Sequence, residues 1–545
     1  MKLRNILLLL PLSGFLLAVT VVALSPDQVR NAAAVLGIDF LSDQEIDLML
    51  PDLEENLEAF DSIGHRDIPN ELSPALVFSP VLRAEQLPAD TSVMAPASPP
   101  PPATTGTAYE WMTVEELASL IYHKRISSRE LTEYFIARLR QYDPTLHCVI
   151  TLTEERALEK ADAMDAELAA GNYRGYLHGI PYGAKDLLAA RGYRTTWGAK
   201  PYENQTIDLD AAVIEQLDAA GAVLCAKLSL GALAWGDVWF GEMTRNPWNT
   251  EAGSSGSSAG SASAVAAGLV PFAIGTETLG SIVSPSTVCG TTGLRPTFGR
   301  VSRYGAMALS WTMDKIGPIT RSATDAGLVL GAIAHYDPRD AHAIRAGFQF
   351  ELPQPTATGK RIGYLKGSFA NDYNFAANDS LALQQLRDLG YELVEIELPN
   401  APDIRFILNV EAAAAFESLT RSGDDDMLTR QVRNAWPNAF RTAHFVPAVA
   451  YVQANRLRRE LMEEMDRLFL ENDIDVYVNP SWNSSSLFIT NMTGQPSITV
   501  PNGMYEGTPT SITFTGRLFG EQALVNIAAA YQGATRWDDL HPTGF

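Results

Sequence analysis

Residues 251–268 read EAGSSGSSAGSASAVAAG, a run of small residues in the middle of a 545-residue chain. A flexible Gly/Ser linker is normally flanked by polar or proline-rich segments. Here the run continues directly into LVPFAIG, and its alanines together with Val265 have the pattern of a buried small-residue helix. We therefore predict that the stretch enters the protein core and is followed by a core strand over 270–274.

The same run contains Gly256–Gly260, which matches the G-x-S-x-G pattern of a nucleophile elbow centred on Ser258. Such an elbow needs a buried strand directly upstream. The preceding residues 243–253, MTRNPWNTEAG, contain no apolar run, so we expect no strand there. A phosphate-binding loop is excluded because no lysine follows Gly260. A serine esterase of the α/β-hydrolase type that uses Ser258 stays open as an alternative, since the chain has eight histidines.

From residue 108 onward, helical and strand-like segments alternate. Capping boxes at Thr113–Glu116 and Ser127–Glu130 precede amphipathic helices. Helical stretches such as DAAVIEQLDAAG alternate with apolar runs such as AVLCAK, RIGYL and ELVEIELP. This alternation indicates an α/β fold with a largely covered sheet, and no change in composition divides 108–545 into two domains.

The N-terminal residues predict export. Lys2 and Arg4 precede an apolar segment over 6–24, so 1–25 is predicted to be a signal peptide or an N-terminal membrane anchor of a periplasmic, secreted or anchored protein. Residues 26–94 are predicted to form a helical arm, with a capping box at Ser42–Glu45 and a helix that ends at Pro51. Residues 95–107 are proline-rich and predict a linker before a single domain at 108–545.

Charge and cysteine content exclude several classes of protein. The 41 Lys and Arg against 64 Asp and Glu give a net charge of −23, which repels polyphosphate, so we predict no nucleic-acid partner. Cys148, Cys225 and Cys289 lie in apolar surroundings and are odd in number, which argues against a disulfide framework or a Cys–His zinc cluster. We predict buried free thiols, no metal and no cofactor.

Three segments taken together resemble a known family. GIPYGAKD (179–186), the serine-rich stretch and GTETLGSIVSPSTVCGTTGLRPTFGRVS (275–302) are similar, in order and spacing, to the three motif blocks of the amidase signature family. The resemblance also covers the capped helices and NMTGQPSITVPNG (491–503), and so spans most of 108–545. It implies the amidase signature fold, a large mixed β-sheet core covered by helices, and an amidohydrolase that cleaves linear amides without a cofactor.

The resemblance also implies a catalytic relay. Its three residues in this sequence are Lys185, Ser257 and Ser281, the last of which would attack the amide and form the acyl-enzyme. A serine hydroxyl is a weak nucleophile, so its proton would pass through Ser257 to Lys185. Lysine accepts a proton only when burial lowers its pKa, and Asp186 would oppose this if its side chain turned inward. The backbone N–H groups of Thr278, Leu279, Gly280 and Ser281 would form the oxyanion hole.

Four positions depart from the family pattern: Glu277 replaces an aspartate, Leu279 and Ala259 replace glycines, and Val283 replaces an arginine. A positive φ at Leu279 would be strained and would put the oxyanion hole in doubt. None of the departures removes a catalytic side chain, so we predict an active enzyme. A non-catalytic binding protein built on an amidase scaffold is the alternative.

Other residues near the motifs are assigned by their context. We interpret His178 as structural, Cys289 as a packing residue, and Asp424–Asp426 as a solvated loop rather than a metal site. Four aromatic residues between the blocks are candidate substrate contacts: Trp197, Trp235, Trp239 and Phe240. The expected partner is a small-molecule amide. Some family members transfer ammonia onto a charged transfer RNA, which the export segment and the charge argue against. The oligomeric state is left open, a homodimer being one alternative.

Overall fold

The computed structural model describes residues 24–38, 41–64, 69–70, 76–82, 87–88, 100–102, 108–353 and 360–545. The chain divides into two compact units, Met1–Asp67 and Ile68–Phe545. Residues 1–23 of the predicted signal or anchor segment, and most of the predicted linker, lie outside the described residues. Among the helices that the structure does describe, none has the length and apolar character needed to cross a membrane.

The first unit contains helices α1 (Pro26–Val35) and α2 (Asp43–Gly64). The predicted capping box at α2 is confirmed, because Ser42 and Glu45 exchange backbone–side-chain hydrogen bonds. The prediction that this helix ends at Pro51 is wrong, since Pro51 lies inside α2. A proline removes one backbone donor, and the strongly helix-forming DLEENLEAF that follows continues the helix past it.

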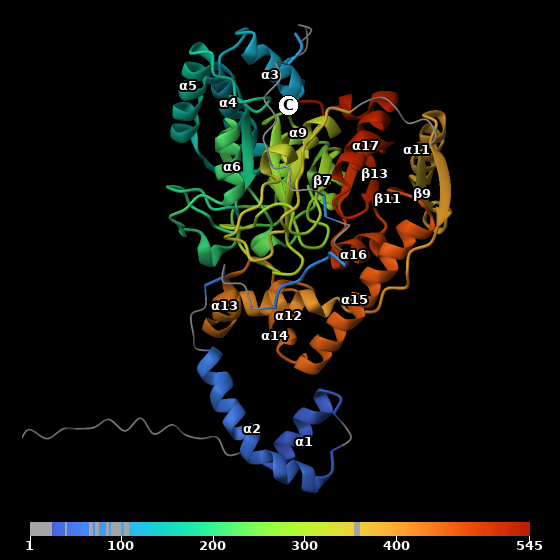
Figure 1. Ribbon diagram of the computed structural model, residues 1–545. Helices are drawn as coiled ribbons and strands as arrows, with labels where there is room; N and C mark the ends of the chain where they lie inside the picture. Colours follow the sequence, from blue (N-terminus) through green and yellow to red (C-terminus); the bar gives the residue numbers. More distant parts are fainter. Residues whose placement is uncertain are drawn as a thin grey trace, which may run out of the picture. The chain divides into compact units, whose positions relative to one another are not determined.

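The second unit is built on an 11-stranded mixed sheet (Figure 1). Four neighbouring pairs, β3–β2, β2–β6, β11–β9 and β9–β10, are parallel, and the other pairs are antiparallel. In spatial order the strands are β1 (Val149–Leu152), β3 (Val223–Leu228), β2 (Pro181–Lys185), β6 (Phe272–Glu277), β8 (Lys315–Thr320), β7 (Thr292–Arg295), β12 (Ser497–Tyr505), β13 (Thr508–Gly516), β11 (Val476–Pro480), β9 (Arg361–Leu365) and β10 (Glu392–Ile396).

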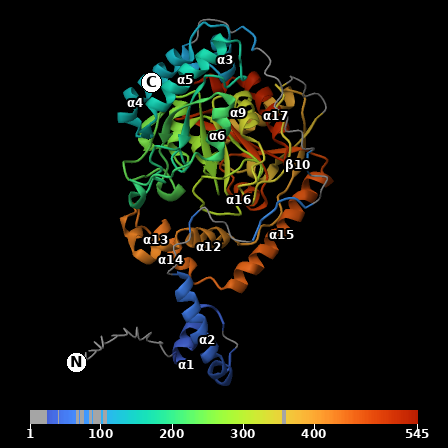
Figure 2. The same cartoon turned by 60° about the vertical axis from the view of Figure 1, so that its left-hand side comes forward.

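Helices surround this sheet. In chain order they are α3 (Val114–Tyr122), α4 (Ser128–Leu146), α5 (Glu154–Ala169), α6 (Ala212–Ala220), α7 (Ala259–Ala266), α8 (Val283–Cys289), α9 (Ala323–Ile333), α10 (Lys366–Phe369), α11 (Ala376–Asp388), α12 (Phe406–Ala415), α13 (Glu417–Ser422), α14 (Trp436–Ala443), α15 (Ala448–Glu471), α16 (Ser484–Thr493) and α17 (Glu521–Thr535). Both capping boxes predicted at the start of α3 and α4 are confirmed. In both views α12, α13 and α14 lie together beyond one end of the strands (Figures 1 and 2).

Both faces of the sheet are covered, as its composition predicts. Along β6, Phe272 and Ile274 belong to one hydrophobic cluster, whereas Ala273 between them belongs to a second cluster. Successive strand residues point to opposite faces, so the two clusters are the two sides of the sheet. Helices α9 and α17 supply residues to the first cluster, and α7 and α8 to the second. The prediction of a large mixed sheet covered by helices is confirmed.

Two short segments before residue 100 pack on this second unit. The Asn70 side chain accepts a hydrogen bond from the Ala308 N–H at 2.6 Å and donates to the Ala308 carbonyl at 2.9 Å. Phe78 lies edge-to-face on Phe298, and the Arg458 guanidinium stacks over the Phe78 ring at 3.7 Å. Residues 69–70 and 76–82 are therefore part of the same compact body as the sheet.

Candidate active site

Three segments meet at one edge of the sheet and bring two of the predicted relay residues, Lys185 and Ser257, into contact. Lys185 is the last residue of β2, Thr276 is near the end of β6, and Ser257 precedes α7. The carboxyl ends of β2 and β6 lie at the same edge because these neighbouring strands are parallel. The serine-rich stretch can approach them because its residues are small: a Cβ atom added to Gly260 would lie 2.5 Å from the Ser229 nitrogen. As predicted, the stretch enters the core, and α7 is buried throughout.

The Lys185 amine is surrounded by hydroxyl groups. Its Nζ donates to the Oγ of Ser257 at 2.7 Å, the Oγ1 of Thr276 at 2.9 Å and the Oγ of Ser258 at 3.1 Å. Lys185 is 0% exposed. The Ser257 and Thr276 hydroxyls can also donate a proton to the amine, so the cage tolerates either protonation state, whereas the Ser258 hydroxyl donates to the Thr276 carbonyl.

Burial holds the pKa of Lys185 well below its usual 10.5, although the carboxylates of Asp314 and Glu277 act in the opposite direction. Asp186 does not turn toward this amine. Its carboxylate binds the Lys227 ammonium at 2.6 Å and accepts the Thr196 N–H at 2.8 Å. The neighbour that could have stabilised the Lys185 ammonium is thus occupied elsewhere, and a neutral lysine becomes accessible at lower pH.

Ser281 lies in the turn between β6 and α8, beside the serine-rich stretch. Its carbonyl oxygen accepts the Ser258 N–H at 3.1 Å, and the residue is 8% exposed. Gly280, directly before it, has φ +94°, a conformation that favours glycine. Leu279 does not have a positive φ, so the strain that its side chain could have introduced does not arise. The four backbone N–H groups predicted to form the oxyanion hole, those of 278–281, thus belong to the single turn between β6 and α8.

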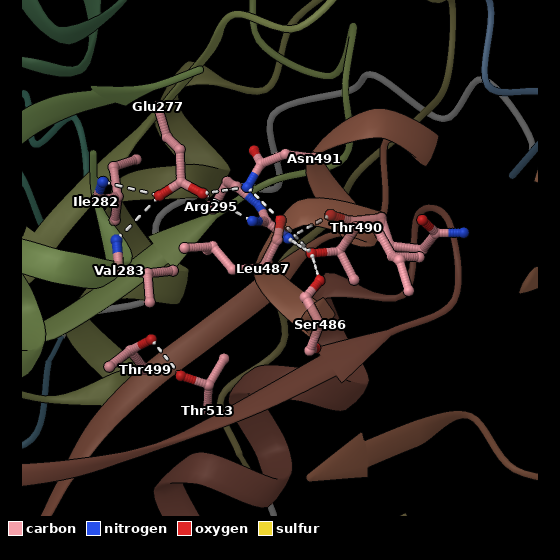
Figure 3. Close-up of polar contacts among 12 residues, drawn as sticks. Glu277, Ile282, Val283, Arg295, Ser486, Leu487, Thr490, Asn491, Thr499 and Thr513 are labelled. Atoms are coloured by element: carbon pink, nitrogen blue, oxygen red, sulfur yellow. Dashed lines mark hydrogen bonds and ion pairs between the residues drawn. The ribbon is translucent and has the colours of Figure 1, made fainter. Parts of the chain in front are cut away.

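The buried Glu277 carboxylate holds this turn in place (Figure 3). It accepts the N–H groups of Ile282 and Val283 at 2.8 and 3.0 Å, directly after Ser281. Its other oxygen accepts from the Arg295 guanidinium at 2.7 Å and the Asn491 amide at 2.8 Å. Despite burial, the charges of Arg295 and Lys315 and the hydrogen bonds from Val283 and Arg295 lower the pKa of Glu277 to about 2. The substitution of glutamate for aspartate therefore leaves a charged anchor for the turn.

Ser258, the residue that the elbow alternative favours, has its hydroxyl group fully engaged. It donates to the Thr276 carbonyl at 3.0 Å and accepts from the Thr276 N–H at 3.1 Å and from Lys185. None of its hydrogen-bond partners within the described residues is a histidine. The expectation of no strand upstream is wrong, because β4 (Arg245–Asn246) and β5 (Asn249–Gly253) form a small separate hairpin. Polar residues suffice for it because it lies outside the main sheet.

The four aromatic candidates have different surroundings, and none of them is among the residues that line the cavity next to the Ser281 turn. Trp197 is buried against Tyr202 and Phe416, and the Arg430 guanidinium stacks on Trp235. Trp239 packs edge-to-face on Phe240 and donates from its indole N–H to the His147 carbonyl. Their contact with substrate stays a prediction.

His178 and the cysteines are placed as predicted, but Asp425 of the predicted solvated loop is buried and pairs with Arg441 at 2.6 Å. Both ring nitrogens of His178 meet the backbone, one at the Met164 carbonyl and the other at the Arg174 N–H. Cys148, Cys225 and Cys289 are buried free thiols, as predicted. Burial raises the pKa of Cys225 to about 12. Within the described residues, no group of three or more His, Cys, Asp or Glu side chains is arranged to hold a metal ion.

A cavity of about 350 Å³ adjoins the turn that carries Ser281. Thr276 and Thr278 from β6 and the turn line one side, and apolar residues such as Leu187 and Met307 line others. Its volume is that of a site for a small organic ligand. Asp314 also lines the cavity, and its carboxylate accepts the Thr278 hydroxyl at 2.6 Å. Of the four residues predicted to form the oxyanion hole, Thr278 lines the cavity, whereas Ser281 itself does not.

Comparisons with known proteins agree with this architecture. Residues 130–487 match the family model described as Amidase. The A-subunit of glutamyl-tRNA(Gln) amidotransferase from Methylococcus capsulatus is 34% identical over 487 residues, 79% of this chain and 99% of that protein. The chain belongs to the amidase signature family. Among solved structures, this amidase signature chain is 31% identical to a peptide amidase from Stenotrophomonas maltophilia, over 78% of this chain and 97% of that one, with a TM-score of 0.70. It is also 25% identical to the glutamyl-tRNA(Gln) amidotransferase A-subunit from Thermotoga maritima, over 81% and 99% of the two chains, with a TM-score of 0.67.

As an amidase signature enzyme, the protein is an amidohydrolase acting on carbon–nitrogen bonds. Two residues of this site, Thr276 and Lys315, were not predicted as site residues from the motifs. Thr276 contributes the third hydroxyl of the Lys185 cage, and Lys315 lines the cavity from the start of β8. A polar residue at the end of an otherwise apolar strand is the signal that could have indicated Thr276. Lys315 follows MD and precedes the apolar IGPI, so the same signal applies to it.

Proposed function

We propose that the protein is an exported amidase that cleaves a small-molecule amide through an acyl-enzyme on Ser281. In this reaction Ser281 attacks the amide carbonyl while its proton passes to Ser257 and then to neutral Lys185. The same path run backwards delivers the proton to the departing amine, and water then hydrolyses the acyl-enzyme. The N–H groups of 278–281 stabilise the oxyanion.

The observation that carries this proposal is the 2.7 Å hydrogen bond between Lys185 Nζ and Ser257 Oγ inside a fully buried cage of hydroxyl groups. A buried lysine whose contacts are hydroxyls rather than carboxylates can lose its proton without breaking an ion pair. The lowered pKa of Lys185 supports the role of final base. The Glu277 anchor supports a turn held ready for the oxyanion, because it binds the N–H groups just beyond Ser281.

A second candidate function follows from the relatives named as amidotransferase subunits: this protein would then release ammonia for transfer within a complex. We favour independent hydrolysis because the net charge of −23 opposes an RNA partner. The basic and apolar residues 2–24 support export, either as a cleaved signal or as an anchor. Fractionation of cells that express the full chain, with N-terminal sequencing of the product, tests this part separately.

The catalytic proposal is tested on the purified chain without RNA or nucleotide. A fluorophosphonate probe should label Ser281, and peptide amides and p-nitroanilides should be hydrolysed. Ser281→Ala and Lys185→Ala should each abolish turnover, and Ser257→Ala should reduce it strongly. A peptide amide is the first substrate to try because a structural relative is a peptide amidase.

Three results separate the alternatives. Labelling at Ser258 instead of Ser281 would support the esterase mechanism, and unchanged turnover in Lys185→Ala would overturn the relay. Hydrolysis that requires added partner proteins would favour the amidotransferase function. Lys360→Met, at an exposed lysine remote from the described site, is the matched control for loss of a lysine.

A further inference from the structure

Three basic residues line the cavity beside the Ser281 turn: Arg303, Lys315 and Arg339. The guanidinium of Arg303 pairs with Asp340 at 3.1 Å, and that of Arg339 pairs with Asp337 at 2.8 Å. Both arginines are thus neutralised by carboxylates of the protein. Lys315 differs from them, because its Nζ has no hydrogen-bond partner among the described residues.

Lys315 is 2% exposed, so it does not lie at an open surface where bulk water would be its hydrogen-bond partner. It is the first residue of β8 and lies opposite Glu277 in the antiparallel register. The Glu277 carboxylate, however, is already taken up by Arg295, Asn491 and two backbone N–H groups. A buried amine without partners is costly, so an unsatisfied one at a cavity wall marks a place where a ligand group is bound.

A second unpaired donor lies on the same cavity. The indole Nε1 of Trp311 is buried and has no hydrogen-bond partner among the described residues. The Asp314 carboxylate, which also lines this cavity, is not free to pair with it. It accepts the N–H groups of Leu309 and Ser310 and the Thr278 hydroxyl. Two residues that line the cavity, Lys315 and Trp311, therefore each carry a donor that the protein leaves unused, whereas the charged acceptors of the cavity are bound by the protein itself.

We infer that this cavity recognises a carboxylate on the amide substrate, with Lys315 as the main donor and Trp311 as a second donor. The apolar side chains of Leu187, Met307 and Ile316 contact the hydrocarbon part of the molecule. A carboxylate fits better than a neutral oxygen, because its charge favours the ammonium form of Lys315, which burial disfavours. The inference rests on the proposed hydrolysis at Ser281 and specifies its substrate class, an amide that carries a free carboxylate.

The test compares matched substrates on the full chain. One series consists of p-nitroanilides of glutaric, adipic and pimelic acid, and its neutral partners carry a terminal isopropyl group in place of the carboxylate. A second series places the carboxylate on the amine side, as 4-acylaminobenzoates and the corresponding isopropyl compounds. At least one carboxylate series should have the higher kcat/KM. In Lys315→Met the ratio of kcat/KM between charged and neutral partners should fall by about 10- to 100-fold, mainly through KM.

Further variants distinguish recognition from misfolding. Trp311→Phe keeps an aromatic side chain but removes the indole N–H together with one of the two fused rings, so it should lower the same ratio by about 3- to 10-fold. Lys315→Arg should retain part of the preference, and Lys360→Met should leave the ratio unchanged. Glutarate should raise the melting temperature of Ser281→Ala protein but not of the Ser281→Ala, Lys315→Met double variant.

The outcomes separate this inference from the proposed function. Turnover and Ser281 labelling without a carboxylate preference in either series would overturn the inference and leave the proposed function standing. The same holds for a preference that survives Lys315→Met. Absence of both labelling and turnover would remove the proposed function, and the effect of glutarate on the Ser281→Ala protein would still decide whether the cavity binds a carboxylate.

Discussion

The end of β2 and the start of β8 each place a buried lysine at the same edge of the sheet, and the two amines have opposite surroundings. Lys185 has three hydroxyl partners within 3.1 Å, whereas Lys315 has no hydrogen-bond partner within the described residues. Burial lowers the pKa of both lysines well below the usual 10.5. On the adjacent β3, the buried Lys227 shows a third arrangement, an ion pair with Asp186 at 2.6 Å.

The comparison shows that buried lysines at one edge of the sheet have three different kinds of surroundings. Lys227 pairs with a carboxylate partner, and this pair contributes to the fold. Hydroxyl partners hold Lys185 in position without fixing its charge, which is what a proton acceptor needs. A lysine with neither kind of partner, Lys315, is left to bind a ligand. The three surroundings predict three different responses to the same replacement by methionine.

The largest effect is expected for Lys185→Met. Loss of the final base should lower kcat/KM for a peptide amide by about 10³-fold or more, with little change in melting temperature. In the wild type, kcat/KM should rise with pH through the lowered pKa of Lys185, because only the neutral amine accepts a proton. Initial rates across pH, compared with Lys360→Met, check this. A wild-type profile without that rise would mean that Lys185 is not the base.

Lys227→Met should act on stability instead. It leaves the fully buried Asp186 carboxylate without its cation, and breaking a buried ion pair on one side costs about 3–5 kcal/mol of unfolding free energy. Urea unfolding of the variant and of the double variant Lys227→Met, Asp186→Leu measures it. The double variant should recover part of the loss because no charge is left unpaired. Equal loss in both would show that packing, and not charge, stabilises this strand.

Glu277 lies between the two contrasted lysines and acts on the charge of both. Its pKa is about 2 in the folded protein against 4.5 as the ordinary value, so the folded state binds the proton less tightly. The carboxylate therefore contributes stability above pH 4.5, about 3 kcal/mol, which is lost as the pH falls from 4.5 through 2.

Glu277→Gln should remove that pH-dependent part, so melting temperatures of variant and wild type should converge between pH 4.5 and 2.5. The turn beyond Ser281 should also lose its charged acceptor, and kcat should fall by about 10-fold. Parallel melting curves over this range would contradict the anchoring role of Glu277.

Local and contiguous features were predictable from the sequence alone. The capping boxes of α3 and α4 form as expected because each bond joins residues three positions apart. The burial of α7 was predictable because a run of small residues is typical of a closely packed helix, whereas the meeting of Lys185 with Ser257 was expected only from the resemblance to the amidase signature family. The continuation of α2 through Pro51 was not predictable from the local pattern, because the cost of one lost backbone hydrogen bond is offset by the stability of the whole helix.

Contacts that depend on register between distant strands could not be predicted. Thr276 reaches the Lys185 amine, and Lys315 lies opposite Glu277, only because β2, β6 and β8 are neighbours in one particular alignment. The same holds for Asp186, whose direction is decided by its pairing with Lys227 on β3. Strand order is a property of the whole sheet, so no local pattern contains it.

The smallest effect, and the sharpest contrast with Lys227, is expected for Lys315→Met. Replacing an unpartnered buried amine by an apolar side chain of similar length should raise the unfolding free energy by about 1–3 kcal/mol. The size of this gain depends on pH. Between the lowered pKa of Lys315 in the folded state and about 10.5, the unfolded wild type binds a proton that the folded state does not. The unfolding free energy of the wild type therefore rises with pH over this range. The advantage of the variant should therefore shrink as the pH approaches 10.5, which urea unfolding at several pH values measures. A variant less stable than the wild type would mean that Lys315 supports the fold, and the difference between the ends of β2 and β8 would no longer be one of function.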